Sequence, residues 1–383
     1  MNSNKNLQNL IVDQSQQKSA SVTELKKHHL NLKKCTKAPA LADYRQGKKT
    51  LYLASKKGEV FNQCASLDER YLCCHFHVIH SISNCPFDCS YCFLQNYLTN
   101  TTTTLITDTK AILAEIQSKV SQNSWYLYRI GNWELGDSLV FNPITKQTNE
   151  LIEGIKNFPN VLFELRTKSD CVDEILDLNH QQKTIVSWTV SPDCIIKQEE
   201  HGTASLKKRL QAMQKVIKAG YLIGLHFDPM LYFKGWETAY SRLVKAIFQA
   251  VSPQNISWIS IGSLRFNPEM KKTIEANFPT TKITTPEMIT GNDRKMRYVK
   301  PLRVKMYQHL YQEIRKQEAK IAPKNPIWIY LCMERWDMWQ KVFGFYPKSI
   351  QENDFLLVQS LAQRFPQLVS QPNWELYQQL KIE

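Results

Sequence analysis

Glycine is scarce in this chain of 383 residues, with only 12, and no apolar run is long enough for a transmembrane helix. The scarcity of glycine excludes collagen-like and glycine-rich low-complexity architectures. The polar N-terminal stretch has no apolar core of the length that a secretory signal needs. Hydrophobic residues make up 43% and charged residues 22%, close to globular averages, which argues against a largely disordered chain. We therefore expect a soluble, cytoplasmic protein with no membrane partner.

Acidic residues are in the minority, because 49 Lys and Arg against 35 Asp and Glu give a net charge of +14. Such an imbalance favours DNA or another nucleic acid, or a different anionic partner. A soluble basic protein with scattered lysines has the same composition. Ten cysteines in a chain without a secretory signal indicate thiols, metal ligands or catalysis rather than a disulfide framework.

The residue pattern divides the chain into three parts. Residues 1–48 form a polar, basic N-terminal segment, which we interpret as an appendage with a short helix around Ser21–Leu32. From about residue 72, short segments rich in β-branched and aromatic residues predict six strands: Cys74–Ser81, Trp125–Gly131, Val161–Thr167, Thr184–Ser191, Tyr221–Asp228 and Ile256–Leu264. Between them, apolar residues at three- and four-residue intervals predict helices at 108–120, 147–157, 205–219 and 236–250.

Strands that alternate with helices predict an α/β fold with a parallel sheet and crossover helices. We assign residues 49–264 to this core, an open or closed α/β barrel of six units. Residues 265–383 form a C-terminal extension that completes or caps the barrel. It is expected to hold a helix at 301–320, a strand near 326–330 and two helices within 353–381.

Cys85, Cys89 and Cys92 form a Cys-x3-Cys-x2-Cys motif directly after the first predicted strand of the core. Three thiolates on one tight loop can bind three irons of a 4Fe-4S cluster and leave the fourth iron open to a small molecule. A structural zinc site would need a fourth protein ligand. Three histidines lie close enough in sequence to offer one, so zinc stays an alternative: His75, His77 and His80.

Beyond this motif, the sequence resembles the radical S-adenosylmethionine (SAM) enzymes, and within them the spore photoproduct lyase family. The resemblance lies in the runs CSYCFLQNYL, HGTASLKKRLQAMQKVIKAGYLIGLHFDPML, WETAYSRL and NFPTTK, across roughly residues 50–310. It implies a partial (β/α)6 radical SAM barrel with a 4Fe-4S cluster and SAM at its mouth. It also implies a low-potential electron donor such as flavodoxin or ferredoxin. In these lyases, a 5′-deoxyadenosyl radical made from SAM starts the splitting of a thymine dimer in DNA.

The resemblance also suggests cofactor and catalytic residues. Tyr91 matches one of two relay tyrosines that flank the last cluster cysteine. Glu134 and Lys168 resemble residues that contact SAM. Thr189 and Ser191 end the fourth predicted strand at the same level, and Arg209 on the following helix is a weaker candidate. For each of the last five, an ordinary exposed or structural side chain is the alternative.

Two features of the family pattern are missing. The lyases return hydrogen from a cysteine near the end of the second strand, but residues 128–139 contain none. Phe93 stands at the second relay position, where a phenyl ring has no O–H hydrogen to donate. Cys332 and Cys194 are conceivable substitute donors, although buried, inert cysteines are more common. A radical SAM enzyme with a different substrate is therefore a second hypothesis.

A third hypothesis is a nucleic-acid-binding protein whose cluster or zinc is structural. Basic residues with a tyrosine among them suit phosphate contacts and base stacking, although a solvated basic helix face explains them equally: Arg294, Lys295, Arg297, Tyr298, Lys300, Arg303 and Lys305.

Overall fold

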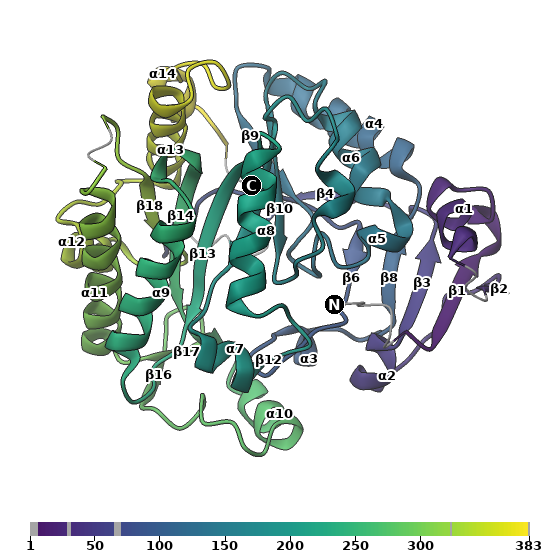
Figure 1. The fold of residues 1–383 in the computed structure, drawn as a ribbon, viewed down its shortest axis with the longest axis horizontal. Helices are drawn as coiled ribbons and strands as arrows, with labels where there is room; N and C mark the ends of the chain where they lie inside the picture. The colour runs from purple at the N-terminus through teal and green to yellow at the C-terminus, as the bar shows by residue number, and fades with distance from the viewer. Residues whose placement is uncertain (1–6, 29–31, 65–69, 322–323, 382–383) are drawn as a thin grey trace.

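An eight-stranded sheet, curled into a half-barrel, forms the centre of the molecule (Figure 1). The computed structural model describes residues 7–28, 32–64, 70–321 and 324–381. The strand order is β18-β14-β13-β11-β10-β9-β5-β4. All neighbours pair in parallel except β4, which is antiparallel to β5. The strands are β4 (Phe61–Gln63), β5 (His77–Ile79), β9 (Tyr128–Gly131), β10 (Val161–Thr167), β11 (Thr184–Thr189), β13 (Leu222–Met230), β14 (Ile256–Ser263) and β18 (Trp328–Leu331).

The predicted α/β barrel is confirmed, and each of the six expected strands is present. The C-terminal extension adds β18 beside β14 as a further parallel strand, so it completes the sheet as well as covering it. The core strands are buried almost throughout, as expected for a parallel sheet that is covered by helices.

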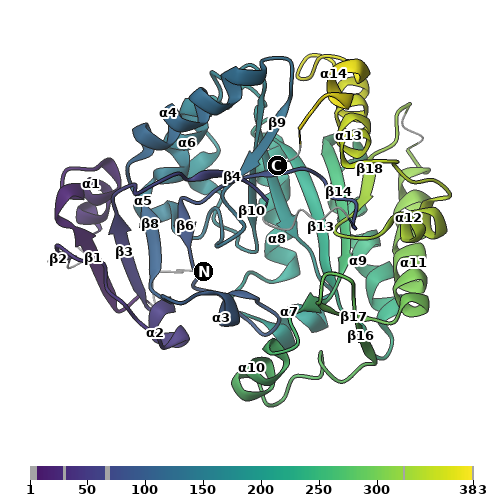
Figure 2. The same cartoon turned by 180° about the vertical axis from the view of Figure 1, so that it is seen from behind.

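Helices cover the outer face of the sheet, with α8 and α9 in front of it in Figure 1 and behind it in Figure 2. In α8 (Leu206–Lys218), buried residues recur every three or four positions, which turns one face towards the sheet. The Ser205 side chain accepts a hydrogen bond from Lys208 N at the start of the helix, and Gly220 follows its end with a φ of +88°. The other long helices are α4 (Thr109–Val120), α6 (Gln147–Ile155), α9 (Trp236–Ala250), α11 (Lys300–Glu318) and α13 (Ile350–Arg364).

The N-terminal segment is part of the folded core, so its interpretation as an appendage is wrong. Strand β1 (Asn9–Asp13) pairs in parallel with β2 (Leu32–Cys35) and β3 (Thr50–Ala54). A five-stranded sheet results, in the order β2-β1-β3-β8-β6, with β8 at Thr103–Ile106 and β6 at Ile82–Ser83. Apolar side chains of β1 and β3 are buried in the common core. The predicted first helix is shorter, α1 (Ala20–Lys27), and residues 29–31 of the prediction lie outside the described residues.

Smaller elements surround the carboxyl ends of the strands. Strands β15 (Arg265–Phe266), β16 (Met288–Thr290) and β17 (Met296–Tyr298) form a small antiparallel sheet. The remaining helices are α2 (Tyr44–Lys48), α3 (Leu94–Tyr97), α5 (Asn142–Thr145), α7 (Asp193–Glu199), α10 (Met270–Asn277), α12 (Trp336–Phe343) and α14 (Trp374–Gln378). Within the described part of the chain, no helix has the length and apolar character to cross a bilayer. The domain boundaries at 48 and 264 remain predictions.

Candidate active site

The three-cysteine loop lies between β6 and α3, at the edge where the two sheets meet. Its second cysteine, Cys89, belongs to the short strand β7 (Asp88–Cys89), which pairs with β12 (Glu200–His201). This pairing sets Cys89 opposite Glu200 and so connects the loop to the segment that follows the fourth predicted strand. All ten cysteines of the chain fall in the described residues and none forms a disulfide, so the trio is available as ligands.

The thiols of the loop lie in a low-dielectric environment. Burial raises the pKa of the Cys85 thiol, and it raises that of Cys89 to about 12 against the lowering effect of Lys168. Buried thiols of this kind become thiolates when a metal binds them. A 4Fe-4S cluster would present a separate iron to each of the three thiolates.

The histidines proposed as a fourth zinc ligand are engaged elsewhere. His75 Nδ1 lies 3.3 Å from Asp354 Oδ2 and 2.9 Å from the Tyr126 hydroxyl. His77 is buried and packs on aromatic rings. His80 Nε2 lies 3.2 Å from Glu134 Oε2. None of these contacts directs an imidazole towards the cysteine loop, which weakens the zinc alternative.

A buried hydrogen-bond network around Glu200 adjoins the cysteine loop. Its hydrogen-bonded members are Tyr91, Ser191, Glu200 and Arg209, and the half-buried Lys168 adds a positive charge beside them. The Tyr91 hydroxyl donates to Glu200 Oε1 at 2.5 Å, and the Ser191 hydroxyl donates to the same oxygen at 2.8 Å. Arg209 Nη2 donates to Glu200 Oε2 at 2.5 Å. We call these residues the Glu200 network.

Charge balance holds the Glu200 network together. Burial on its own raises the pKa of Glu200, but the positive charges of Arg209 and Lys168 outweigh it and hold this pKa below its usual value. The Lys168 ammonium lies 5.6 Å from the centre of the Tyr91 ring. Burial lowers the pKa of Lys168, yet the neighbouring Cys89 and Glu200 raise it overall. The network therefore places a half-buried cation and an oriented phenol beside the loop.

Four of the proposed site residues thus lie in or against one network. Tyr91, Lys168 and Ser191 are members, and the Thr189 carbonyl accepts a hydrogen bond from Arg209 Nη1 at 2.8 Å. Arg209, the weaker candidate, is fully buried rather than a surface charge. Glu200 was missed, although it directly precedes the His-Gly-Thr run that carries the family resemblance.

Asp137 is a second residue that the sequence analysis missed. Its carboxylate accepts from Lys168 N at 2.8 Å and from the Thr167 hydroxyl at 2.8 Å, and it also caps the turn at Leu139. The loop after β9 therefore fixes the backbone from which Lys168 extends. Its signal in the sequence was a lone aspartate three residues after Glu134.

Glu134 lies outside the Glu200 network. Its carboxylate pairs with His80, and Oε1 lies 3.9 Å from the Cys64 sulfur. The adjacent Trp133 ring stacks on the Arg166 guanidinium, 3.4 Å from the ring centre. Phe93 is 43% exposed and meets Tyr97 edge-on. We call His80 and Glu134 the Glu134 pair.

The substitute donor cysteines differ in their surroundings. Cys332 follows β18, and Arg265 Nη2 donates to its sulfur at 3.3 Å. Arg265 also forms a paired hydrogen bond with Asp228, at 2.9 and 3.0 Å. Burial raises the pKa of Cys332, which keeps it a thiol. Cys194 lies in α7 and packs partly buried against the core.

Most of the basic stretch proposed for nucleic acid is structural. Three of its residues are buried: Arg297, Tyr298 and Arg303. Arg297 pairs with Asp293, and Arg303 pairs with Glu334. Lys300 and Lys305 form ion pairs with Asp337 and Glu237. Arg294 is exposed and Lys295 half-buried, in the turn between β16 and β17, so a continuous basic face is not formed by these seven residues.

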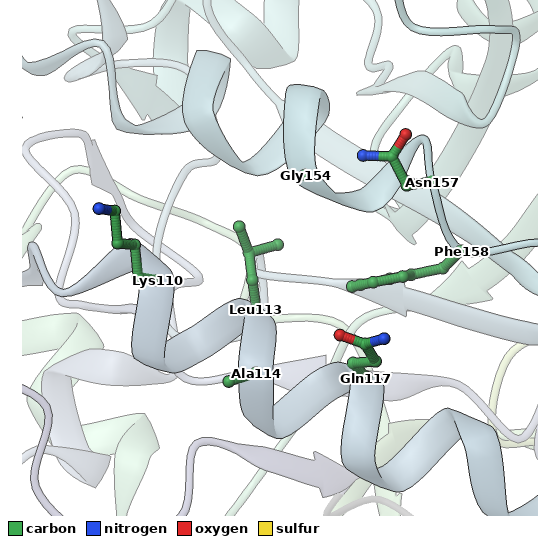
Figure 3. A pocket seen from close by; sticks show the side chains of 7 residues that line it. All are labelled: Lys110, Leu113, Ala114, Gln117, Gly154, Asn157 and Phe158. Atoms are coloured by element: carbon green, nitrogen blue, oxygen red, sulfur yellow. The ribbon is translucent and has the colours of Figure 1, made fainter.

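A groove of about 400 Å3 lies between α4 and α6, lined by the residues labelled in Figure 3: Lys110, Leu113, Ala114, Gln117, Gly154, Asn157 and Phe158. In Figure 1 these helices lie at the upper right, whereas α3, α7 and β12 lie at the lower edge. The groove is therefore remote from the cysteine loop.

A half-barrel whose mouth carries a three-cysteine loop defines the radical SAM class. Among solved structures, spore photoproduct lyase has this fold: a variant with bound AdoMet and dinucleoside spore photoproduct gives a TM-score of 0.71 at 21% identity, covering 85% of this chain and 98% of that one. A complex of the lyase with dinucleoside spore photoproduct matches equally, with a TM-score of 0.71 and the same coverage.

The sequence comparisons agree. The family model for spore photoproduct lyase matches residues 4–330, so the chain belongs to the spore photoproduct lyase family. The spore photoproduct lyase of Bacillus subtilis (strain 168) is 28% identical over 251 residues, 64% of this chain and 71% of that protein. The lyase of Geobacillus sp. (strain Y412MC61) is 27% identical over 250 residues, with the same coverage.

Proposed function

We propose that this protein is a radical SAM enzyme that binds a 4Fe-4S cluster through Cys85, Cys89 and Cys92 and acts on a photoproduct in DNA. The observation that carries the proposal is the Glu200 network beside the cysteine loop. A purely structural cluster needs only its ligands, whereas this site also holds a half-buried cation and oriented hydroxyls next to them. Membership of the lyase family supports the same chemistry.

When bound, the cluster and SAM supply an electron and a 5′-deoxyadenosyl radical, and the protein supplies position and exclusion of water. Lys168 is suited to hold the carboxylate or ribose hydroxyls of SAM, because a half-buried ammonium favours an anionic or hydroxyl partner. Glu200 fixes the hydroxyls of Tyr91 and Ser191 in one orientation. Thr189, at the end of β11, contributes to the same wall of the site.

For the substrate, the lyase relatives and the basic composition favour nucleic acid. Two of the similar lyase structures contain a bound dinucleoside spore photoproduct. Arg294 and Lys295, at the β16–β17 turn, remain the members of the basic stretch best placed to meet phosphate. A flavodoxin or ferredoxin is the expected source of the electron.

A second candidate is a radical SAM reaction on a different substrate. It is favoured by the loop after the second parallel strand, which contains no cysteine, although the family resemblance implies a hydrogen-donating cysteine near the end of that strand. Glu134 in this loop is paired with His80, and a carboxylate cannot return a hydrogen atom as a thiol does. Phe93 removes the second relay hydroxyl as well, so both changes affect the same step.

Anaerobic reconstitution with iron and sulfide tests the proposal. The protein is reduced with SAM, and 5′-deoxyadenosine is measured with and without dinucleoside spore photoproduct. Conversion of the dinucleoside spore photoproduct into two thymidines supports the lyase reaction. Formation of 5′-deoxyadenosine without dimer cleavage supports the second candidate. Uptake of zinc, or a cluster that never cleaves SAM, contradicts both and favours a nucleic-acid-binding protein.

A further inference from the structure

Helix α2 of the N-terminal segment contacts the three-cysteine loop through one buried lysine. Lys48 Nζ donates to the Cys85 carbonyl at 2.9 Å and to the Phe87 carbonyl. Its side chain is only 6% exposed, and its nearest carboxylate, Asp88, lies 3.8 Å away. Two carbonyls of the cysteine loop are therefore bound to a cation that comes from outside the barrel.

A second chain of hydrogen bonds connects α2 to the same loop. The Thr103 hydroxyl donates to the Gly47 carbonyl, and the Thr101 hydroxyl donates to the Asp43 carbonyl at 2.8 Å. The Thr101 carbonyl accepts from the Asn84 side chain, which in turn accepts from Cys85 N at 2.8 Å. Helix and loop are thus fixed to each other from two directions.

Helix α2 packs closely against the segment that contains Thr101. A Cβ on Gly47 would lie 1.9 Å from the Thr101 carbonyl oxygen, so only glycine allows this approach. The Tyr44 hydroxyl is buried beside the Cys92 thiol of the cysteine loop, and burial together with this thiol raises the pKa of Tyr44. Lys48 lies 4.3 Å from the centre of the Tyr44 ring. The ring therefore shields Lys48 and places its hydroxyl next to a cysteine of the loop.

The buried positive charge of Lys48 needs a negatively charged partner. A buried ammonium is costly unless it faces negative charge, and Asp88 alone is distant and partly exposed. A cluster held by three thiolates carries net negative charge, and its reduction potential depends on nearby charges, hydrogen bonds and solvent exposure. Lys168, which is half-buried, lies near Cys89 beside the Glu200 network, so two lysine side chains are present at the cysteine loop.

We propose that Lys48 is a positioning residue for the cluster loop and that its charge raises the reduction potential of the cluster. The inference rests on the proposed function, because it assumes that the cysteines bind a cluster. It assigns the N-terminal sheet a share in the active site, through α2, although the three cysteines all lie outside it.

The test compares Lys48→Met with Lys49→Met in the full-length protein. Lys49 is the adjacent, exposed lysine, so its variant removes the same charge outside the site. After anaerobic reconstitution, iron and sulfide are counted, and the midpoint potential is measured by redox titration followed by electron paramagnetic resonance. We expect a lower potential and faster loss of iron to a chelator in Lys48→Met, wild-type values in Lys49→Met, and recovery of the potential in Lys48→Arg.

Equal potentials and equal iron retention in Lys48→Met and Lys49→Met would overturn the inference. If Lys48→Met fails to fold by circular dichroism, Lys48→Gln carries the same comparison, because it keeps a hydrogen-bond donor and removes the charge. A wild-type protein that takes up no cluster refutes the proposed function instead. A wild-type cluster whose potential is unaffected by any Lys48 substitution refutes this inference alone.

Discussion

The Glu200 network and the Glu134 pair both lie at the mouth of the half-barrel, but they differ in burial and in the number of contacts that hold them. The Glu200 network is buried except for the half-buried Lys168, is balanced in charge and is joined by hydrogen bonds from several segments. The Glu134 pair is more exposed, with 34% of the His80 side chain in solvent, and its carboxylate also lies 3.9 Å from the Cys64 sulfur. Lys168, Thr189 and Ser191 are therefore embedded in the fold, whereas Glu134, which was also expected to contact SAM, lies in the loop that lacks the hydrogen-donating cysteine of the lyase pattern.

This contrast separates two parts of the chemistry. Making a radical needs a fixed cluster and a fixed cofactor, so its residues are constrained by many mutual contacts. The later steps of the reaction depend on the substrate and on a hydrogen donor, and the residues that serve them can change without disturbing the fold. The chain keeps the first set and departs in the second, which is the pattern expected when radical formation is retained and the substrate reaction is altered.

Replacing Cys89 by Ala should have the largest effect. Loss of one of three thiolates removes an iron ligand, so we expect no stable cluster and no detectable 5′-deoxyadenosine. Iron and sulfide analysis with the nucleoside assay provides the measurement. Cys35→Ala, in β2 of the N-terminal sheet, serves as the control and should behave as wild type. Wild-type formation of 5′-deoxyadenosine by Cys89→Ala would contradict the assignment of Cys89 as a ligand of the cluster.

Glu200→Gln should produce the next largest effect. The amide keeps the size of the side chain but removes the charge that offsets Arg209 and Lys168. Loss of one partner from a buried ion pair destabilises proteins by about 4 kcal/mol. Urea unfolding should show that loss, and SAM binding by calorimetry should weaken. The exposed Glu287→Gln is the control. A change below about 0.5 kcal/mol would mean that the Glu200 network does not act as a unit.

A histidine beneath the Arg166–Trp133 stack should make stability depend on pH. His226 Nε2 lies 2.5 Å from Glu164 Oε1, and burial lowers the pKa of His226 to about 4. The charge of Arg166 adds to this lowering, while Glu164 and Asp228 oppose it. Between about pH 6.5 and pH 4, the unfolded chain therefore binds more protons than the native protein. Stability should fall as the pH falls through this range, by up to about 3 kcal/mol in total.

Urea unfolding at several pH values measures this effect. His226→Gln should flatten the dependence between pH 6.5 and pH 4, whereas the exposed His201→Gln should leave it unchanged. If both variants keep the wild-type slope, the interior below the Arg166–Trp133 stack does not hold a neutral histidine. The comparison with Glu200→Gln then shows whether the interior strands or the Glu200 network contribute more to stability.

The strands of the barrel were predictable because each is marked by a local run of strand-forming residues. Val161–Thr167 is a continuous run of strand-forming residues, and it matches the observed strand at both ends. The N-terminal sheet was not predictable, since its strands have only two to five residues and most of them pair in parallel across long separations in sequence. A polar segment with short apolar runs resembles an appendage until its partner strands are known.

The site residues also divide into those marked by a local pattern and those brought together only by the fold. The cysteine motif is a contiguous pattern, so its spacing alone suggested the cluster ligands that we propose. Glu200 carries no such pattern, because its importance arises from pairing with Cys89 across 110 intervening residues. Arg303 shows the converse: a basic stretch suggested a surface, but its guanidinium is buried against Glu334. Charge alone does not reveal which residues a fold will pair.

Phe93→Tyr should have the smallest effect and bears directly on the Glu134 pair. The ring is exposed and meets only Tyr97 among the aromatic neighbours described, so an added hydroxyl should change stability by less than about 0.5 kcal/mol. We expect no gain in dimer cleavage, because the loop after the second parallel strand still lacks a thiol. The measurement is thymidine formation from dinucleoside spore photoproduct beside 5′-deoxyadenosine formation. A large gain would show that the missing relay hydroxyl alone limits the lyase reaction, and the Glu134 pair would then lose its significance as the point of divergence.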